Sequence, residues 1–138
     1  KDGSTKEIVA YYLSRSLEMS IVYETLKQLK VAVSGHFHPE AILHSDQGFH
    51  YTHPEFQEKV KKLGIKQSMS RKGNCWDNAP MEGFFGHFKD LAEYKSCESI
   101  VEVQAEVTRV IEDYNHCRYQ WGLKRMTPSQ YRGHLLAA

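Results

Sequence analysis

Short strand-like segments alternate with segments of helical spacing along this chain, and that alternation restricts the folds it can adopt. The short runs bounded by turn residues predict strands at residues 7–13, 41–45 and 65–69. Apolar residues that recur at intervals of three and four predict helices at residues 19–30, 53–63, 78–94 and 100–114. Strand, helix, strand, helix, strand and then helices is the order of an α/β fold.

The charge is nearly balanced overall but is uneven along the chain. A net charge of +1 over 138 residues excludes the global positive field of a dedicated nucleic-acid binder, so any DNA contact must come from local charge. Residues 59–72 hold six basic residues and no acid, and residues 114–138 hold four and no acid. A solvated helix face or loop explains each run when it is taken alone.

The cysteines and the apolar runs indicate a cellular setting. Three widely spaced cysteines without a CxxC pair suggest neither a disulfide framework nor a structural zinc site. A reduced, cytoplasmic compartment fits this, and no apolar run approaches the length that spans a membrane. The chain opens in polar residues without an initiator Met, which predicts the C-terminal part of a longer protein.

Two acidic residues occupy places where a carboxylate is hard to explain as surface decoration. Asp46 follows the predicted strand 41–45, and Glu82 opens a predicted helix whose other face is aromatic. The positions 46 and 82 leave 35 residues between the two acids. Two hard oxygen ligands could converge on one cation. The local alternatives are that Asp46 forms a turn over Gly48 and that Glu82 interacts with the positive end of its own helix.

Three motifs in fixed order carry a family resemblance. They are HSDQG at residues 44–48, RKGNCWDNAPMEGFF at residues 71–85, and a closing pattern of Tyr114-Asn115, Arg118, Thr127-Pro128 and Tyr131. Together they resemble the catalytic core of DDE transposases and retroviral integrases, and most closely the integrase-type transposases of bacterial insertion sequences. The resemblance implies a ribonuclease-H-like mixed sheet flanked by helices. It also implies metal-dependent cleavage of DNA ends and strand transfer.

The same resemblance assigns roles to the two acids. Asp46 and Glu82 would be catalytic residues and ligands of two Mg²⁺ or Mn²⁺ ions. In-line displacement at a phosphodiester needs both the attacking and the departing oxygen stabilised, and two divalent ions provide this. The family's first aspartate lies on a strand that precedes the Asp2 turn, and that strand is not in this sequence. Asp2 itself is not assigned to the metal site.

Six residues are candidate DNA contacts by the same resemblance: Lys89, Asn78, Arg71, Lys72, Trp76 and Arg118. Lys89 shares a helix face with Glu82 and Gly86, whereas Phe84, Phe88 and Leu91 point elsewhere, towards a core. Lys89 corresponds to a basic residue that integrases present to the terminal nucleotides.

Most of these assignments have local alternatives. Asn78 is explained equally by capping of its helix, and Trp76 by anchoring of its loop instead of stacking on a base. Arg71 and Lys72 would reach phosphates of the same strand. The closing motif with Arg118 is explained equally by packing of the last helix on the sheet.

Histidines raise two further sites that the sequence disfavours. A triad of His44, Ser45 and Asp46 needs side chains on one face, but neighbours in a strand point to opposite faces. His36, His38 and His50 have no Cys or carboxylate at ligand spacing, so they are interpreted as loop histidines.

Residues 1–138 are therefore expected to form a partial integrase core that lacks its first strand, with residues 114–138 as its C-terminal tail motif. The expected partners are element ends, target DNA and further copies of the chain. The fragment alone should be catalytically incomplete. Two other functions stay open: a non-catalytic DNA-binding or interaction remnant of a transposase, and a ribonuclease-H-type nuclease.

Overall fold

The computed structural model describes residues 1–71 and 78–138, which divide into two compact units. One unit comprises Ala10–Pro80, and the other joins Lys1–Val9 to Met81–Ala138. The boundary falls within one helix, after Pro80.

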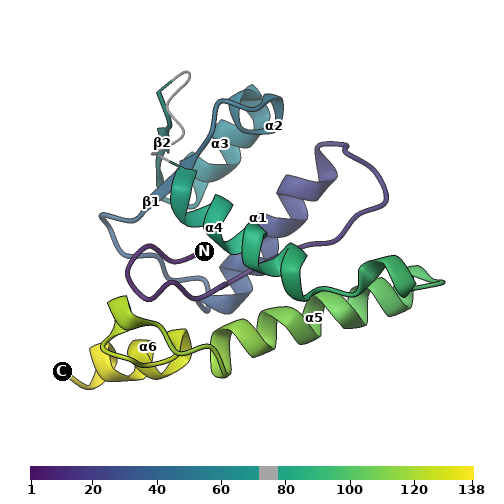
Figure 1. Cartoon of the computed structure of the whole chain (residues 1–138). Helices are drawn as coiled ribbons and strands as arrows, with labels where there is room; N and C mark the ends of the chain where they lie inside the picture. Colours follow the sequence, from purple (N-terminus) through teal and green to yellow (C-terminus); the bar gives the residue numbers. More distant parts are fainter. Residues whose placement is uncertain (72–77) are drawn as a thin grey trace. The chain divides into compact units, whose positions relative to one another are not determined.

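The unit Ala10–Pro80 is built around a short parallel pair of strands (Figure 1). Its elements are α1 (Ser20–Ala32), β1 (Ile42–Ser45), α2 (Phe49–Thr52), α3 (Pro54–Lys62) and β2 (Lys66–Met69). Within the described residues, β1 and β2 form a two-stranded parallel sheet in which Ile42 faces Lys66 and Ser45 faces Met69. β1 and β2 can run parallel because α3, which lies between them in the sequence, carries the chain back to the end of the sheet where β1 begins.

The core of this unit follows from the helical spacing of its apolar residues. Val22 and Leu26 of α1 lie four positions apart, as do Phe56 and Val60 of α3, and all four are buried together with Ile65. His53 caps α3 by accepting a hydrogen bond from the Glu55 backbone N–H. Gly64 follows α3 with a φ of +74°, a conformation that favours glycine.

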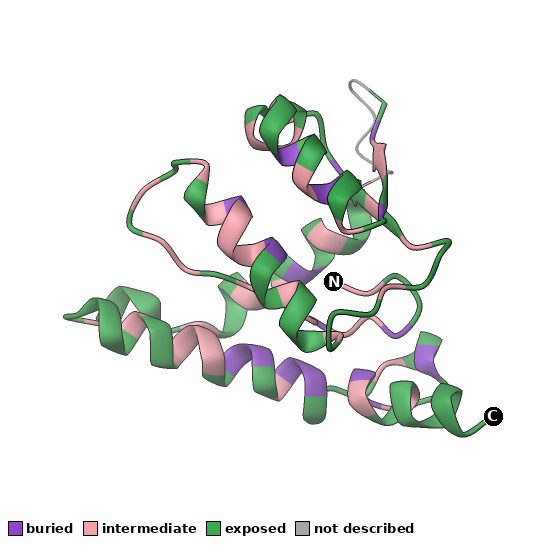
Figure 2. Cartoon of the chain, turned by 180° about the vertical axis from the view of Figure 1, so that it is seen from behind, coloured by how far each residue is buried: buried purple, intermediate pink, exposed green. Residues whose placement is uncertain are grey.

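The second unit is mainly helical. Its elements are α4 (Ala79–Leu91), the 3₁₀ turn η2 (Tyr94–Ser96), α5 (Ile100–His116), the 3₁₀ turn η3 (Trp121–Leu123) and α6 (Pro128–Ala137). Figure 2 shows that the buried positions of α5 lie in its C-terminal half, at Val110, Ile111, Tyr114 and Asn115. The ring of Phe84 in α4 meets Tyr114 edge-on, with ring centroids 5.0 Å apart.

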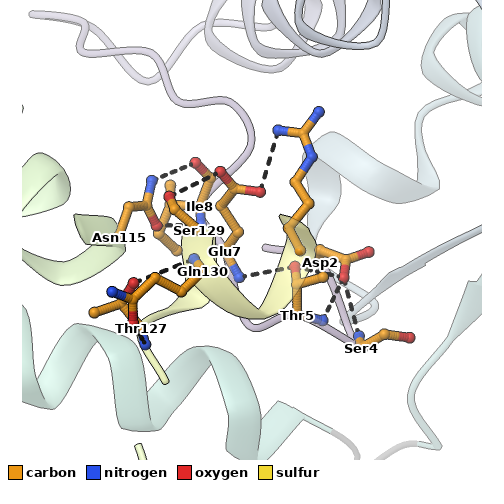
Figure 3. Close-up of polar contacts among 10 residues, drawn as sticks. Asp2, Ser4, Thr5, Glu7, Ile8, Asn115, Thr127, Ser129 and Gln130 are labelled. Atoms are coloured by element: carbon orange, nitrogen blue, oxygen red, sulfur yellow. Dashed lines mark hydrogen bonds and ion pairs between the residues drawn. The ribbon is translucent and has the colours of Figure 1, made fainter. Parts of the chain in front are cut away.

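Polar contacts hold the N-terminal segment of this unit to residues more than a hundred positions away (Figure 3). The Asn115 side chain accepts from the Ile8 N–H at 2.9 Å and donates to the Ile8 C=O at 3.0 Å. Glu7 accepts from Ser129 and Arg132 of α6. The first turn of the chain closes on Asp2, whose Oδ1 accepts from the backbone of Ser4 and from Thr5.

The expected strand at residues 7–13 is wrong. The segment forms no ladder within the described chain, and the amide of Asn115 pairs with both backbone groups of Ile8. The other predicted strands and helices are present, although α4 ends at Leu91 instead of Tyr94. The short helix α2 and the terminal helix α6 were not anticipated. Among the residues described, no helix is both long and apolar enough to cross a membrane.

Candidate functional site

The end of the strand pair β1–β2 is organised by one buried serine that follows β2. The Ser70 N–H donates to the Ser45 C=O at 2.8 Å, which extends the ladder by one residue. Its hydroxyl donates to Asn78 Oδ1 at 2.7 Å and lies 3.1 Å from His44 Nε2. Gln47 Nε2 donates to the Ser70 C=O at 3.0 Å. Ser70 therefore joins the chain after β1, the end of β2 and the residue before α4.

Asp46 lies at this same end of the strand pair, immediately after β1, and its side chain is exposed. Its Oδ1 accepts from the Gly48 N–H at 2.8 Å, so the local turn expected over Gly48 is present. A Cβ at position 48 would lie 2.8 Å from Asp46 Oδ1, so a side chain there would require this carboxylate to shift. The turn engages one carboxylate oxygen and leaves the exposed group further acceptor capacity. Burial and the Asp46 charge both raise the pKa of Tyr51.

Glu82 lies in the first turn of α4 and is exposed, as are Gly86 and Lys89. The buried Phe84 and the half-buried Phe88 occupy other positions of this helix. The helical spacing therefore predicted the exposed face of α4, although Leu91, expected in the core, is 40% exposed. A carboxylate in the first turn also benefits from the unpaired N–H groups there.

The remaining candidates differ in their surroundings. Asn78 directs its side-chain oxygen to Ser70, which ties the residue before α4 to the strand end. Arg71 is exposed, and Lys72 and Trp76 lie outside the described residues. Arg118 Nη1 contacts the ring of His87 in α4, at 2.9 Å from Nε2. Burial and the Arg118 charge lower the pKa of His87, which is the neutral partner that an arginine donor requires.

The histidines considered for a triad or a metal site contact hydroxyl groups or the backbone, and His50, expected in a loop, lies in α2. The two ring nitrogens of His44 lie 3.1 Å from the hydroxyls of Ser68 and Ser70, whereas Ser45 is buried and donates to the Asp46 C=O. This arrangement does not form a triad. Each of the histidines considered for a metal site instead contacts nearby backbone: His36, His38 and His50. Among residues 1–71 and 78–138, no three Cys, His, Asp or Glu side chains form a metal-binding group.

The role of Ser70 was not foreseen from the sequence. Its position directly after a predicted strand and a few residues before a predicted helix was visible, but a serine there is also typical of an ordinary loop. The chemistry available is that of exposed carboxylates at the ends of regular elements, which are the hard oxygen donors that Mg²⁺ prefers.

Two sequence models of the integrase core domain match the chain, one over residues 1–75 and the other over residues 63–128. The putative transposase InsK for insertion sequence element IS150 of Escherichia coli is 44% identical over 95% of the chain and 46% of its own length. An uncharacterized transposase-like protein of Haemophilus influenzae is 40% identical over 96% of the chain and 60% of its own length. The chain thus spans about half the length of the curated relatives it matches.

Solved structures with the same fold come from retroviruses. One match is a simian T-cell lymphotropic virus intasome in complex with PP2A regulatory subunit B56 gamma. The alignment covers 86% of the present chain and 41% of the viral chain, with a TM-score of 0.72. The catalytic core domain of BIV integrase matches 91% of the chain and 78% of its own with a TM-score of 0.67. The identities are 18% and 22%, so the likeness establishes the fold. The expected α/β, ribonuclease-H-like class is confirmed.

Proposed function

Because this chain belongs to the integrase core domain family, we propose that it is part of the catalytic core of an insertion-sequence transposase. The complete protein would cleave the ends of its element and join them to target DNA, as a polynucleotidyl transferase in the bacterial cytoplasm. Residues 1–138 would form part of that core, and residues 114–138 its C-terminal tail. The observation that carries this proposal is the 44% identity to a putative insertion-sequence transposase over 95% of the chain.

Asp46 and Glu82 are the proposed catalytic residues. Both are exposed carboxylates, one directly after a parallel strand and one in the first turn of a helix, and both elements pack on buried side chains. Rigid elements suit ligands that must hold a fixed geometry.

Divalent metal ions are general in this family, and the oxygen donors of these two acids fit Mg²⁺ or Mn²⁺. Two such ions, when bound, would activate the attacking hydroxyl and stabilise the departing oxygen. The contribution of this chain would be to position the two carboxylates. The Asp46 turn over Gly48 and the Asn78–Ser70 bond before α4 are the local contacts that support this role.

DNA would be held by cationic and amide side chains. Lys89 is exposed in the last turn of α4, on the same side of the helix as Glu82. Arg71, Asn78 and Arg118 are further proposed contacts, and Lys72 and Trp76 remain predictions from sequence. We propose that the complete protein works on paired element ends as a homo-oligomer.

The test is a strand-transfer assay with labelled element ends and Mn²⁺, on the chain in its complete native reading frame. Asp46→Asn keeps an oxygen that can accept from the Gly48 N–H, and Glu82→Gln keeps the size of its side chain, so each removes only the charge. Asp90→Asn, at another exposed acid of α4, is the matched control. Both site variants should lose joining by at least about a hundredfold while DNA binding is retained, and the control should stay active.

The other outcomes identify the rival functions. Equal joining by the wild type and Glu82→Gln would assign Glu82 to its helix alone. DNA binding without joining by the wild type would indicate a non-catalytic remnant. Cleavage of RNA–DNA hybrids without joining of DNA would indicate a ribonuclease-H-type nuclease.

A further inference from the structure

The connection between α5 and α6 exposes two large aromatic side chains. We call residues Tyr119–Arg125 the aromatic loop. Trp121 is 81% exposed and Tyr119 is 67% exposed. A tryptophan buries a large apolar surface where it is packed, so the exposed ring of Trp121 leaves that surface available to a partner.

Contacts within the aromatic loop keep the side chain of Trp121 exposed. Leu123, two positions after Trp121, is only 2% exposed and anchors the loop from below. The base is closed by an antiparallel bridge in which the Gln120 N–H donates to the Met126 C=O at 3.0 Å. The Arg125 N–H returns to the Gln120 C=O at 3.1 Å. With Leu123 held inside, the short turn cannot bury Trp121 without breaking these contacts.

The backbone of the aromatic loop is strained at two consecutive residues. Lys124 and Arg125 have φ values of +52° and +60°, a region that non-glycine residues seldom enter. Such strain persists only where the surrounding contacts impose it, and it gathers at functional positions. In the aromatic loop, the two residues with this strained backbone are adjacent and both are cationic.

The cations lie beside the exposed ring. The guanidinium carbon of Arg125 is 4.4 Å from the centroid of Trp121, a cation–π distance. Lys124 Nζ is 3.1 Å from His134 Nε2 of α6. Residues 114–138 contain no acid. The partner suited to this surface is therefore negatively charged and has flat faces that can stack.

We propose that the aromatic loop binds an unpaired nucleotide of DNA, with Trp121 stacking on the base and Arg125 and Lys124 contacting the adjacent phosphates. The inference rests on the proposed function only in taking DNA as the substrate. Element ends that are opened or frayed during cleavage would offer such nucleotides. A duplex with all bases paired would offer its phosphates alone.

A second copy of the chain is the competing occupant of this surface. The centre of a protein interface is usually depleted of charge, whereas the exposed ring here is flanked by two cations. The charge therefore favours a nucleic acid.

The test uses fluorescence anisotropy in EDTA to measure how tightly the complete protein and its variants bind two DNA probes. One probe is a duplex with a short unpaired overhang, and the other is the same duplex with blunt ends. Trp121→Ala should weaken binding of the overhang about tenfold and of the blunt duplex less than about twofold. Trp121→Phe, which keeps a ring, should restore most of the overhang preference. Arg125→Ala should weaken the binding of both duplexes. It should also lower the slope of log affinity against log salt concentration by about one, the value for one phosphate contact. Val101→Ala, at a 73% exposed residue of α5, is the control and should change neither.

Equal weakening of both duplexes by Trp121→Ala, or no weakening of either, would overturn the inference. A change in sedimentation without a change in DNA affinity would assign the surface to a second copy of the chain and would also overturn it. Because the assay contains no metal and scores no joining, it is independent of the catalytic proposal. A retained overhang preference in a protein that cannot join DNA would refute only the proposed function, and a chain that binds no DNA would refute both.

Discussion

The two compact units of this chain differ in the kind of contact that stabilises each of them internally. Ala10–Pro80 is closed by an apolar core, to which helix spacing contributes two pairs of residues four positions apart in α1 and α3. In the other unit, Lys1–Val9 is joined to residues 81–138 largely through buried or half-buried polar groups, with Asn115 as the central one. The first arrangement is local in sequence, and the second pairs residues 107 positions apart.

The comparison shows two ways to hold a short, strand-like segment in place. In the first unit β1 has a neighbour, and its ladder with β2 satisfies the backbone. In the second unit the segment around Ile8 lacks a neighbouring strand among the described residues, so a side-chain amide supplies the donor and the acceptor. Apolar cores tolerate substitution in proportion to volume, whereas a buried polar pair fails when either partner is lost.

Truncation of the apolar core should have the largest effect. Phe56 is 1% exposed, and Phe56→Ala should lower the free energy of unfolding by about 3–5 kcal/mol because it removes buried surface and leaves a cavity. Phe49→Ala is the matched control, because Phe49 is in the same unit but 70% exposed. Urea denaturation followed by circular dichroism measures both. A similar loss in the two variants would contradict an apolar core centred on Phe56.

Loss of the polar tie should have a smaller but more local effect. Asn115→Leu leaves the Ile8 N–H and C=O without their partner and should cost about 1–3 kcal/mol. Hydrogen exchange at the Ile8 amide should accelerate, while exchange in β1 and β2 should not change. Asn115→Asp keeps the acceptor for the Ile8 N–H and should fall between the wild type and the leucine variant. Unchanged exchange at Ile8 in Asn115→Leu would refute the tie.

The cap of α6 should rank third. Thr127 is fully buried, its hydroxyl accepts from the Gln130 N–H, and its own N–H donates to Gln130 Oε1. Thr127→Ala should cost about 1–2 kcal/mol, near the upper end for a cap. Ser99 caps α5 by accepting from the Glu102 N–H but is exposed, so Ser99→Ala should cost less. Equal costs by thermal denaturation would show that burial of the cap adds nothing.

The dependence on pH should be the smallest effect. Burial and the Arg118 charge hold the pKa of His87 below its ordinary value of 6.5, so between that lowered pKa and 6.5 the unfolded chain binds more protons than the folded one. The free energy of unfolding should therefore fall as pH falls through this window. His87→Gln should flatten that dependence, as urea denaturation at about pH 7 and about pH 5.5 would show. A steeper dependence in the variant would reverse the assigned sign.

Much of the candidate site was predictable because it depends on local pattern. The spacing of aromatic residues in α4 predicted that Glu82 and Lys89 share an exposed face, and the run before Asp46 predicted a strand that ends there. The contacts that position these elements were not predictable. Ser70 bonds to residues on three segments, and nothing in its immediate neighbours distinguishes it from a loop serine.

The aromatic loop shows the same division at the scale of two residues. Trp121 and Leu123 are both apolar members of one turn, yet one is 81% exposed and the other 2% exposed. Only the closure of the turn by Gln120 and Met126 distinguishes them.

By itself the sequence determined the helices α1, α3, α4 and α5, the strands of the first unit and the motifs that identify the family, since periodicity and motif order are properties of neighbouring residues. The tertiary structure alone decided that residues 7–13 are not a ladder strand, that α6 docks on Glu7, and that Ser70 joins the strand end to the start of α4. Each of these outcomes depends on a hydrogen-bond partner in another segment of the chain. A polar side chain does not reveal its partner until the fold brings the two groups together.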